Sequence, residues 1–233
     1  MSTGGEKRAL IIGASRGLGY ALTTEFLDRG WQVTATERKP SALRELAESA
    51  GGRLTVETVD IAVPAQVTAL HERLGGSRID LLFVNAGTNY TTDPSATFTD
   101  VSTDDFIRVM VTNALSPMRV IETLEDLVPP SGTIGVMSSG QGSVTDNTNG
   151  GFEVYRASKS ALNQLMRSFA ARHADDPRTL LLMAPGWVKT DLGGPGARLN
   201  LDDSIPGVAD TIEAQTGRGG LHYLDRQNRS VNW

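Results

Sequence analysis

Short apolar segments alternate with longer amphipathic segments along most of this 233-residue chain. Several of the short segments are apolar throughout and rich in Val, Ile, Leu and Thr, as expected for parallel strands that are buried on both faces. The predicted strands are residues 8–12, 32–36, 54–59, 80–84, 133–137, 179–184 and 221–223. The predicted helices are residues 18–29, 41–50, 65–74, 102–127, 152–172 and 201–215.

This alternation predicts an α/β fold: a Rossmann-like, doubly wound parallel sheet of about seven strands with helices on both faces. We expect one domain over residues 1–233, because the length suits such a domain and no repeat or low-complexity linker divides the chain. Residues 140–151 and 186–196 form long or glycine-rich loops after predicted strands. Open α/β sheets bind ligands at these carboxyl ends, so we expect the functional site there.

Composition and charge exclude several classes of function. The net charge of −5, without a basic run, argues against nucleic acid or an anionic membrane as the main partner. The absence of cysteine excludes disulfides, thiolate metal sites and a cysteine nucleophile. His71, His173 and His222 are scattered without metal-ligand spacing, so we expect no metal.

No segment of the sequence has the character of a membrane span. The longest strongly apolar runs, such as residues 180–184, have only the length of a strand. Residues 1–6 are polar and contain no apolar signal core. We therefore expect a soluble protein in the cytoplasm.

A glycine-rich turn follows the first predicted strand and opens the first predicted helix. Its spacing is G-x-x-x-G-x-G, and missing side chains let the backbone approach a pyrophosphate whose charge meets the helix N-terminus. The alternative is a tight turn without a ligand. The predicted dinucleotide-binding residues here are Gly13, Ser15, Arg16, Gly17, Leu18 and Gly19.

The end of the second predicted strand bears on the choice of dinucleotide. Glu37 would accept hydrogen bonds from ribose hydroxyls and repel a 2′-phosphate, whereas Arg38 would attract that phosphate, with help from Arg16. Two positive charges against one carboxylate favour NADP, and NAD stays open. A solvated surface pair is the alternative interpretation of Glu37 and Arg38.

Two further groups follow the third and fourth predicted strands. Asp60, with Ile61 beside it, is placed to meet the adenine region of a dinucleotide. Asn85, Ala86 and Gly87 supply small residues where the backbone must pass the cofactor. Each group alone is ordinary turn chemistry, but both recur at carboxyl ends of successive strands.

Tyr155 and Lys159 are four residues apart on a predicted helix, so their side chains lie on one face, one turn apart. A tyrosine hydroxyl titrates near pH ~10, and a nearby ammonium favours the phenolate and lowers that pKa. Such a pair behind a dinucleotide turn predicts proton transfer coupled to hydride transfer. A solvated tyrosine and an exposed lysine are the alternative.

Together these motifs resemble the short-chain dehydrogenase/reductase family, in its compact single-domain branch. The motifs are residues 13–19, Asp60, residues 85–87, Asn113, Ser138, Ser139, residues 155–159, Pro185 and Gly186. Residues 139–148 and 186–194 resemble the C-factor-like and sniffer-type carbonyl reductases. The resemblance covers nearly the whole chain.

The resemblance implies a catalytic set of Asn113, Ser139, Tyr155 and Lys159. Tyr155 would be the general acid or base, and Lys159 would bind the nicotinamide ribose and depress the tyrosine pKa. Ser139, or alternatively Ser138, would hydrogen-bond the substrate oxygen. Asn113 would hold a water that links Lys159 to solvent.

The resemblance also implies the remaining contacts of the cofactor. Thr190 and the backbone at Val188 would contact the nicotinamide carboxamide, after Pro185 and Gly186. The substrate pocket is expected from residues 140–151, Phe152, Trp187 and residues 191–196.

The leading function is therefore an NAD(P)(H)-dependent oxidoreductase that interconverts a carbonyl compound and an alcohol. A dinucleotide-binding sensor with little or no turnover is the alternative, motivated by the resemblance to C-factor. An epimerase or dehydratase with an added substrate domain is disfavoured, because only about 80 residues follow Tyr155.

A second copy of the chain is the expected protein partner. The helices predicted at residues 102–127 and 152–172 carry apolar faces, and the resemblance implies that such a pair packs against another subunit. We therefore expect a homodimer or homotetramer. Complete burial of these faces within one chain is the alternative.

Overall fold

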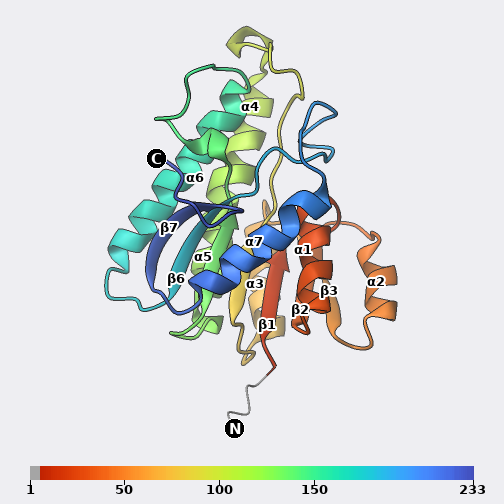
Figure 1. Ribbon diagram of the computed structural model, residues 1–233. Coiled ribbons are helices and arrows are strands. Elements are labelled where there is room, and N and C mark those ends of the chain that lie inside the picture. The colour runs from red at the N-terminus through yellow and green to blue at the C-terminus, as the bar shows by residue number, and fades with distance from the viewer. Residues whose placement is uncertain (1–5) are drawn as a thin grey trace.

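A computed structural model describes residues 6–233, so residues 1–5 of the polar opening segment lie outside the described residues. The strands form one parallel seven-stranded sheet in the order β3-β2-β1-β4-β5-β6-β7 (Figure 1). This arrangement confirms the predicted doubly wound α/β fold. The strands are β1 (Arg8–Ile12), β2 (Gln32–Glu37), β3 (Leu54–Thr58), β4 (Leu81–Val84), β5 (Thr133–Met137), β6 (Thr179–Ala184) and β7 (Gly220–Asp225).

Helices cover both faces of the sheet, and each face has its own hydrophobic core. One face carries α1 (Gly17–Asp28), α2 (Leu43–Ser49) and α7 (Leu201–Gln215), and Figure 1 shows α1 and α7 in front of the strands. The other face carries α3 (Pro64–Leu74), α5 (Ser116–Leu124) and α6 (Glu153–Arg172), and α4 (Thr103–Met110) packs against α6.

The central strands are apolar on both faces because both faces are covered. Leu10 belongs to one core and Ile11 to the other, as alternation along a strand requires. Every residue of β4, β5 and β6 is buried. Since these strands offer no exposed side chain, a polar site can form only from the loops at the edge where the parallel strands end.

The helical stretch predicted at residues 102–127 is present, but its helical type changes along the way. The helix α4 ends at Met110, a π-helical segment η2 follows at Val111–Leu115, and α5 begins at Ser116. A short 3-10 turn, η3 (Glu125–Leu127), completes the region. The π segment contains Asn113, and such segments occur frequently at functional sites.

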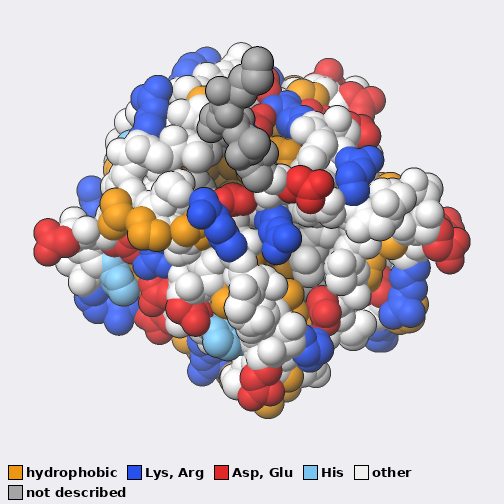
Figure 2. Space-filling model, turned by 90° about the horizontal axis from the view of Figure 1, so that it is seen from below, with side chains coloured by type: hydrophobic (Ala, Val, Ile, Leu, Met, Phe, Trp, Pro, Cys, Tyr) orange, Lys and Arg blue, Asp and Glu red, His pale blue; other side chains and the backbone are white. Residues whose placement is uncertain are grey.

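The lower surface of the molecule in Figure 1, which Figure 2 shows from below, carries charges of both signs. Figure 2 shows Lys and Arg side chains interspersed with Asp and Glu over this face, without a large area of one sign. Among the residues that the structure describes, no helix combines the length and the apolar character that a membrane span requires.

Candidate active site

A cleft of about 1250 Å³ opens where the parallel strands end. It brings together the predicted site residues from seven separate segments of the chain, except Gly19 and Asn113, which do not line it. The predicted residues that line it are Gly13, Ser15, Arg16, Gly17, Leu18, Glu37, Arg38, Asp60, Ile61, Asn85, Ala86, Gly87, Ser139, Tyr155, Lys159, Pro185, Gly186, Val188 and Thr190.

Glycine is required twice in the turn between β1 and α1. A Cβ on Gly13 would lie 2.7 Å from Ala86, and one on Gly19 would lie 2.3 Å from the Gly13 carbonyl oxygen. The Asn85 side chain closes this turn, since its Nδ2 donates to that same carbonyl at 2.7 Å. The backbone is thus exposed along a cradle that side chains would fill, which suits close approach of a diphosphate.

Glu37 does not present its carboxylate to the cleft. Its side chain is fully buried, Oε2 accepts from Ser41 Oγ at 2.6 Å, and Oε1 accepts from Arg44 Nε at 2.9 Å. Burial opposes ionisation, but the hydrogen bonds from Ser41 and Arg44 and the charge of Arg44 outweigh it and hold the Glu37 pKa below its usual value. A solvated Glu37–Arg38 pair is therefore ruled out, and the carboxylate is already satisfied.

The two arginines expected near a 2′-phosphate are both exposed at the cleft. Arg16 Nη1 lies 2.5 Å from an Asp191 carboxylate oxygen, so the glycine turn and the loop after β6 meet across the cleft. Both side chains are largely exposed, and such a pair contributes little stability. Arg16 is therefore able to leave Asp191 for a stronger anion.

Tyr155 and Lys159 lie on α6, with Lys159 Nζ 5.7 Å from the centre of the tyrosine ring. Burial raises the pKa of Tyr155 to about 12, while hydrogen bonding with the Ser139 side chain opposes the rise. Burial also lowers the pKa of Lys159 to about 8. The expected depression of the tyrosine pKa by Lys159 is not found, because Lys159 Nζ donates to the Met137 carbonyl at 2.9 Å and burial dominates.

The structure separates the two serines that follow β5. Ser138 is buried, and its Oγ donates to Asn163 Oδ1 at 2.6 Å. Ser139 is partly exposed and lines the cleft together with Tyr155. The geometry therefore favours Ser139 over Ser138 as the substrate-facing group.

Asn113 is fully buried beside the cleft. Its Oδ1 accepts from the Thr88 N–H at 2.8 Å, and its Nδ2 donates to the Thr88 carbonyl at 2.8 Å and to Ser158 Oγ at 2.9 Å. A Cβ on Gly87 would lie 3.5 Å from Asn113 Oδ1 and 3.6 Å from Lys159 Nζ. Asn113 thus joins the loop after β4 to α6, and the water expected there stays a prediction.

The loop after β6 reaches the cleft through Val188 and Thr190. Thr190 Oγ1 accepts from the Gly193 N–H at 3.0 Å, which folds the following glycines back. Val188 is buried and pairs with Leu199. At the opposite end of the cleft, Asp60 Oδ1 accepts from the Ala62 N–H at 2.9 Å.

One wall of the cleft was missed from the sequence. Residues 88–92, together with Arg108 and Thr112, line it, whereas none of residues 142–151 and 194–196 does. The length of the segment between β4 and α4, at the carboxyl end of a central strand, was the available signal. Gly140, Gln141, Phe152, Trp187, Asp191, Leu192 and Gly193 line the cleft as predicted.

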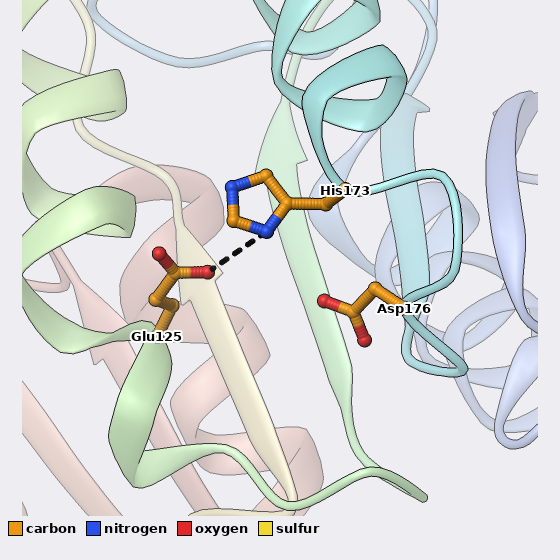
Figure 3. A group of neighbouring side chains, drawn as sticks. All are labelled: Glu125, His173 and Asp176. Atoms are coloured by element: carbon orange, nitrogen blue, oxygen red, sulfur yellow. Dashed lines mark ion pairs between the residues drawn. The ribbon is translucent and has the colours of Figure 1, made fainter.

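Glu125, His173 and Asp176 form a separate cluster, and Figure 3 shows the imidazole of His173 facing the Glu125 carboxylate. Arg178 pairs with both carboxylates, at 2.9 Å from Glu125 and 2.5 Å from Asp176. The guanidinium thus satisfies the acids that a metal ion would need. This cluster ties η3 and the end of α6 to the start of β6.

The similarity of this chain to known proteins agrees with the geometry of the cleft. The family model for short chain dehydrogenase matches residues 7–197. A solved structure of a putative short-chain dehydrogenase/reductase from Burkholderia multivorans with bound NADP is 57% identical, with a TM-score of 0.95 over 98% of this chain and 100% of that one.

Two further relatives carry the names of different activities. A carbonyl reductase from Pseudomonas aeruginosa PAO1 in complex with NADP is 35% identical, with a TM-score of 0.89 over 98% of this chain and 100% of that one. A 1-hydroxy-2-glutathionyl-2-methyl-3-butene dehydrogenase from Rhodococcus sp. (strain AD45) is 33% identical over 96% of this chain and 98% of its own length.

Proposed function

This chain belongs to the short-chain dehydrogenase family and is an NAD(P)-dependent oxidoreductase, and we propose that it interconverts a carbonyl compound and an alcohol with Tyr155 as general acid and base. The observation that carries this proposal is the convergence of Ser139, Tyr155 and Lys159 in one cleft with the glycine turn. We assign this activity to a single NAD(P)-binding domain over residues 1–233.

We propose NADP rather than NAD as the preferred cofactor. The glycine cradle leaves backbone free for the diphosphate, while Arg16 and Arg38 supply positive charge to the cleft. Glu37 would oppose a 2′-phosphate, but its carboxylate is engaged by Ser41 and Arg44. The NADP-bound structures of two relatives support the same choice.

In the proposed reduction, the Tyr155 hydroxyl donates its proton to the substrate oxygen while Ser139 Oγ donates a hydrogen bond to the same atom. The bound cofactor supplies the hydride that the carbonyl carbon accepts. In the reverse direction Tyr155 accepts the proton from the alcohol. Lys159, with its pKa lowered to about 8, lies one turn away and would hold the nicotinamide ribose.

The first experiment is a titration with NADPH and NADH that follows nicotinamide fluorescence, combined with turnover on a panel of carbonyl compounds and alcohols. We expect tighter binding of NADPH, and a loss of that preference when Arg16 and Arg38 are changed to Ala. Tyr155→Phe should fold normally, bind the cofactor and lose nearly all turnover. Substantial residual activity in Tyr155→Phe would overturn the mechanism.

The same measurements test the sensor alternative. Tight cofactor binding without turnover across the whole panel would favour a dinucleotide-binding sensor. Turnover that depends on Tyr155 would exclude it. A cytoplasmic location also stays a prediction, which cell fractionation would test.

We propose that the protein is a homodimer or homotetramer. Phe106 and Ile107 on α4, Leu115 in the π segment and Leu165 on α6 all expose apolar side chains. Burial of such side chains against a second copy would remove apolar surface from water. Light scattering tests the assembly, with Leu115→Glu and Leu165→Glu expected to dissociate it. A monomer at all concentrations would refute the proposal.

A further inference from the structure

A hydroxyl from the edge strand reaches the main chain of the substrate-facing serine. Tyr223 lies on β7 and is only 4% exposed, and its hydroxyl donates to the main-chain carbonyl of Ser139, 84 residues earlier in the chain. Ser138 and Asn163 lie close to the same hydroxyl. Ser138 Oγ donates to Asn163 Oδ1 at 2.6 Å, so buried polar groups surround the main chain at Ser139.

The carbonyl that Tyr223 binds is also part of the turn that orients Ser139. Ser139 caps the 3-10 turn η4 (Gly140–Gly142), its Oγ accepts from the Gln141 N–H at 3.1 Å, and its carbonyl accepts from the Gly142 N–H at 2.8 Å. Without the tyrosine hydroxyl, the carbonyl would keep only the turn's own hydrogen bond. The direction of the Ser139 side chain therefore depends on a contact from β7.

Trp233 in turn holds Tyr223 in place. The two rings meet edge to face, with centroids 5.4 Å apart, and the Arg167 guanidinium lies 4.2 Å from the Trp233 ring on another side. The Trp233 carbonyl oxygen accepts from the Thr145 N–H at 3.0 Å and from Ser143 Oγ at 3.3 Å. In Figure 1 the C end of the ribbon accordingly lies beside the loop after β5.

We propose that Tyr223, supported by Trp233, is a positioning residue that aims Ser139 at the substrate oxygen. This inference rests on the proposed function, in which Ser139 donates to that oxygen. An oxyanion donor must be held within a fraction of an ångström to be effective. Edge strand β7 thus influences the reaction indirectly, through the position of Ser139, although Tyr223 does not line the cleft.

The test is Tyr223→Phe, which keeps the ring against Trp233 and removes only the hydroxyl. Tyr20→Phe is the matched control, because Tyr20 also packs against a core but its hydroxyl makes no hydrogen bond among the described residues. We expect Tyr223→Phe to lower kcat about tenfold with an unchanged Kd for NADPH, and Tyr20→Phe to match the parent.

Repeating Tyr223→Phe in a Ser139→Ala variant separates an effect on the position of Ser139 from an effect on overall stability. In Ser139→Ala, the hydroxyl that Tyr223 aims is gone, so adding Tyr223→Phe should lower kcat no further. Trp233→Phe should retain most of the turnover, while Trp233→Ala should approach the loss in Tyr223→Phe. An equal loss from Tyr223→Phe in both backgrounds, or no loss in the parent, would overturn the proposal.

Hydrogen exchange gives a measurement that does not depend on turnover. In Tyr223→Phe, the amides of Gln141 and Gly142 should exchange faster than in the parent, while amides in α1 stay unchanged. Unchanged exchange at Gln141 and Gly142 would also overturn the inference. If the parent reduces no carbonyl compound, the proposed function fails, and the exchange result still decides whether Tyr223 holds the Ser139 main chain.

Discussion

The carboxylate of Glu37 lies 2.9 Å from the Nε of Arg44, at the start of the helix that follows β2. The glutamate side chain is fully buried, and the arginine is about half exposed. The charge of the Glu37 carboxylate, which would repel a 2′-phosphate, is therefore balanced by the Arg44 guanidinium. Arg38, the neighbour of Glu37, stays exposed at the cleft.

Loss of Arg44 should weaken both the fold and the preference for NADPH. Arg44→Ala leaves the buried Glu37 carboxylate with only Ser41, which should lower the free energy of unfolding by about 2 kcal/mol in a urea titration. The uncompensated charge should also raise the Kd for NADPH more than the Kd for NADH. Adding Glu37→Gln should restore NADPH binding, and equal losses for both nucleotides would contradict this account.

Lys159 should make stability depend on pH above neutrality. Its folded pKa is about 8 against 10.5 when exposed, so the unfolded chain binds more protons between those values and stability rises with pH. The cost of the buried charge is fully present below pH ~8 and is relieved above it. Relative to Lys159→Met, the cofactor-free parent should gain about 1 kcal/mol in free energy of unfolding between pH ~7 and ~9. A constant difference between the two proteins would contradict the lowered pKa.

At position 152, glycine should give a more stable protein than alanine. Phe152 precedes α6 with φ 51° and ψ 39°, a left-handed conformation that is strained for a side chain with a Cβ. Phe152→Ala and Phe152→Gly both remove the ring, but only glycine relieves the strain. We expect Phe152→Gly to be the more stable of the two by about 0.5–1 kcal/mol in urea denaturation. A more stable alanine variant would show that the conformation is not retained.

Asn113 should contribute to folding as well as to the site. Asn113→Ala removes hydrogen bonds to both main-chain groups of Thr88, which should lower the free energy of unfolding by about 2 kcal/mol. Ser158→Ala removes only one partner of Asn113 and should cost about 1 kcal/mol. Thermal and urea unfolding compare the two variants. Equal losses would mean that the contacts with Thr88 carry little of the stability.

Strands were the most predictable elements, because burial on both faces leaves a continuous apolar run in the sequence. The predicted range 133–137 is β5, and 179–184 is β6. Helix ends shifted by only a residue or two, as in α3, which starts at Pro64 rather than residue 65. The change of helical type within 102–127 was not visible, because an apolar period near 3.6 continues through it. The bond that joins Asn113 to Ser158 exists only once α6 has packed alongside, and the bonds of Asn113 with Thr88 exist only once the loop after β4 lies beside it.

The order of motifs along the chain was sufficient to predict the sheet and most of the residues that meet in the cleft, but not the wall formed by residues 88–92, Arg108 and Thr112. Each of those depends on local patterns: an apolar run, glycines without side chains, and a tyrosine and lysine one helical turn apart. The tertiary structure alone decided that Glu37 faces Arg44, that Lys159 meets the Met137 carbonyl, and that Tyr223 reaches Ser139. These partners come from different elements, and a side chain's charge or pKa depends on the neighbours and the burial that packing brings, which no local pattern contains.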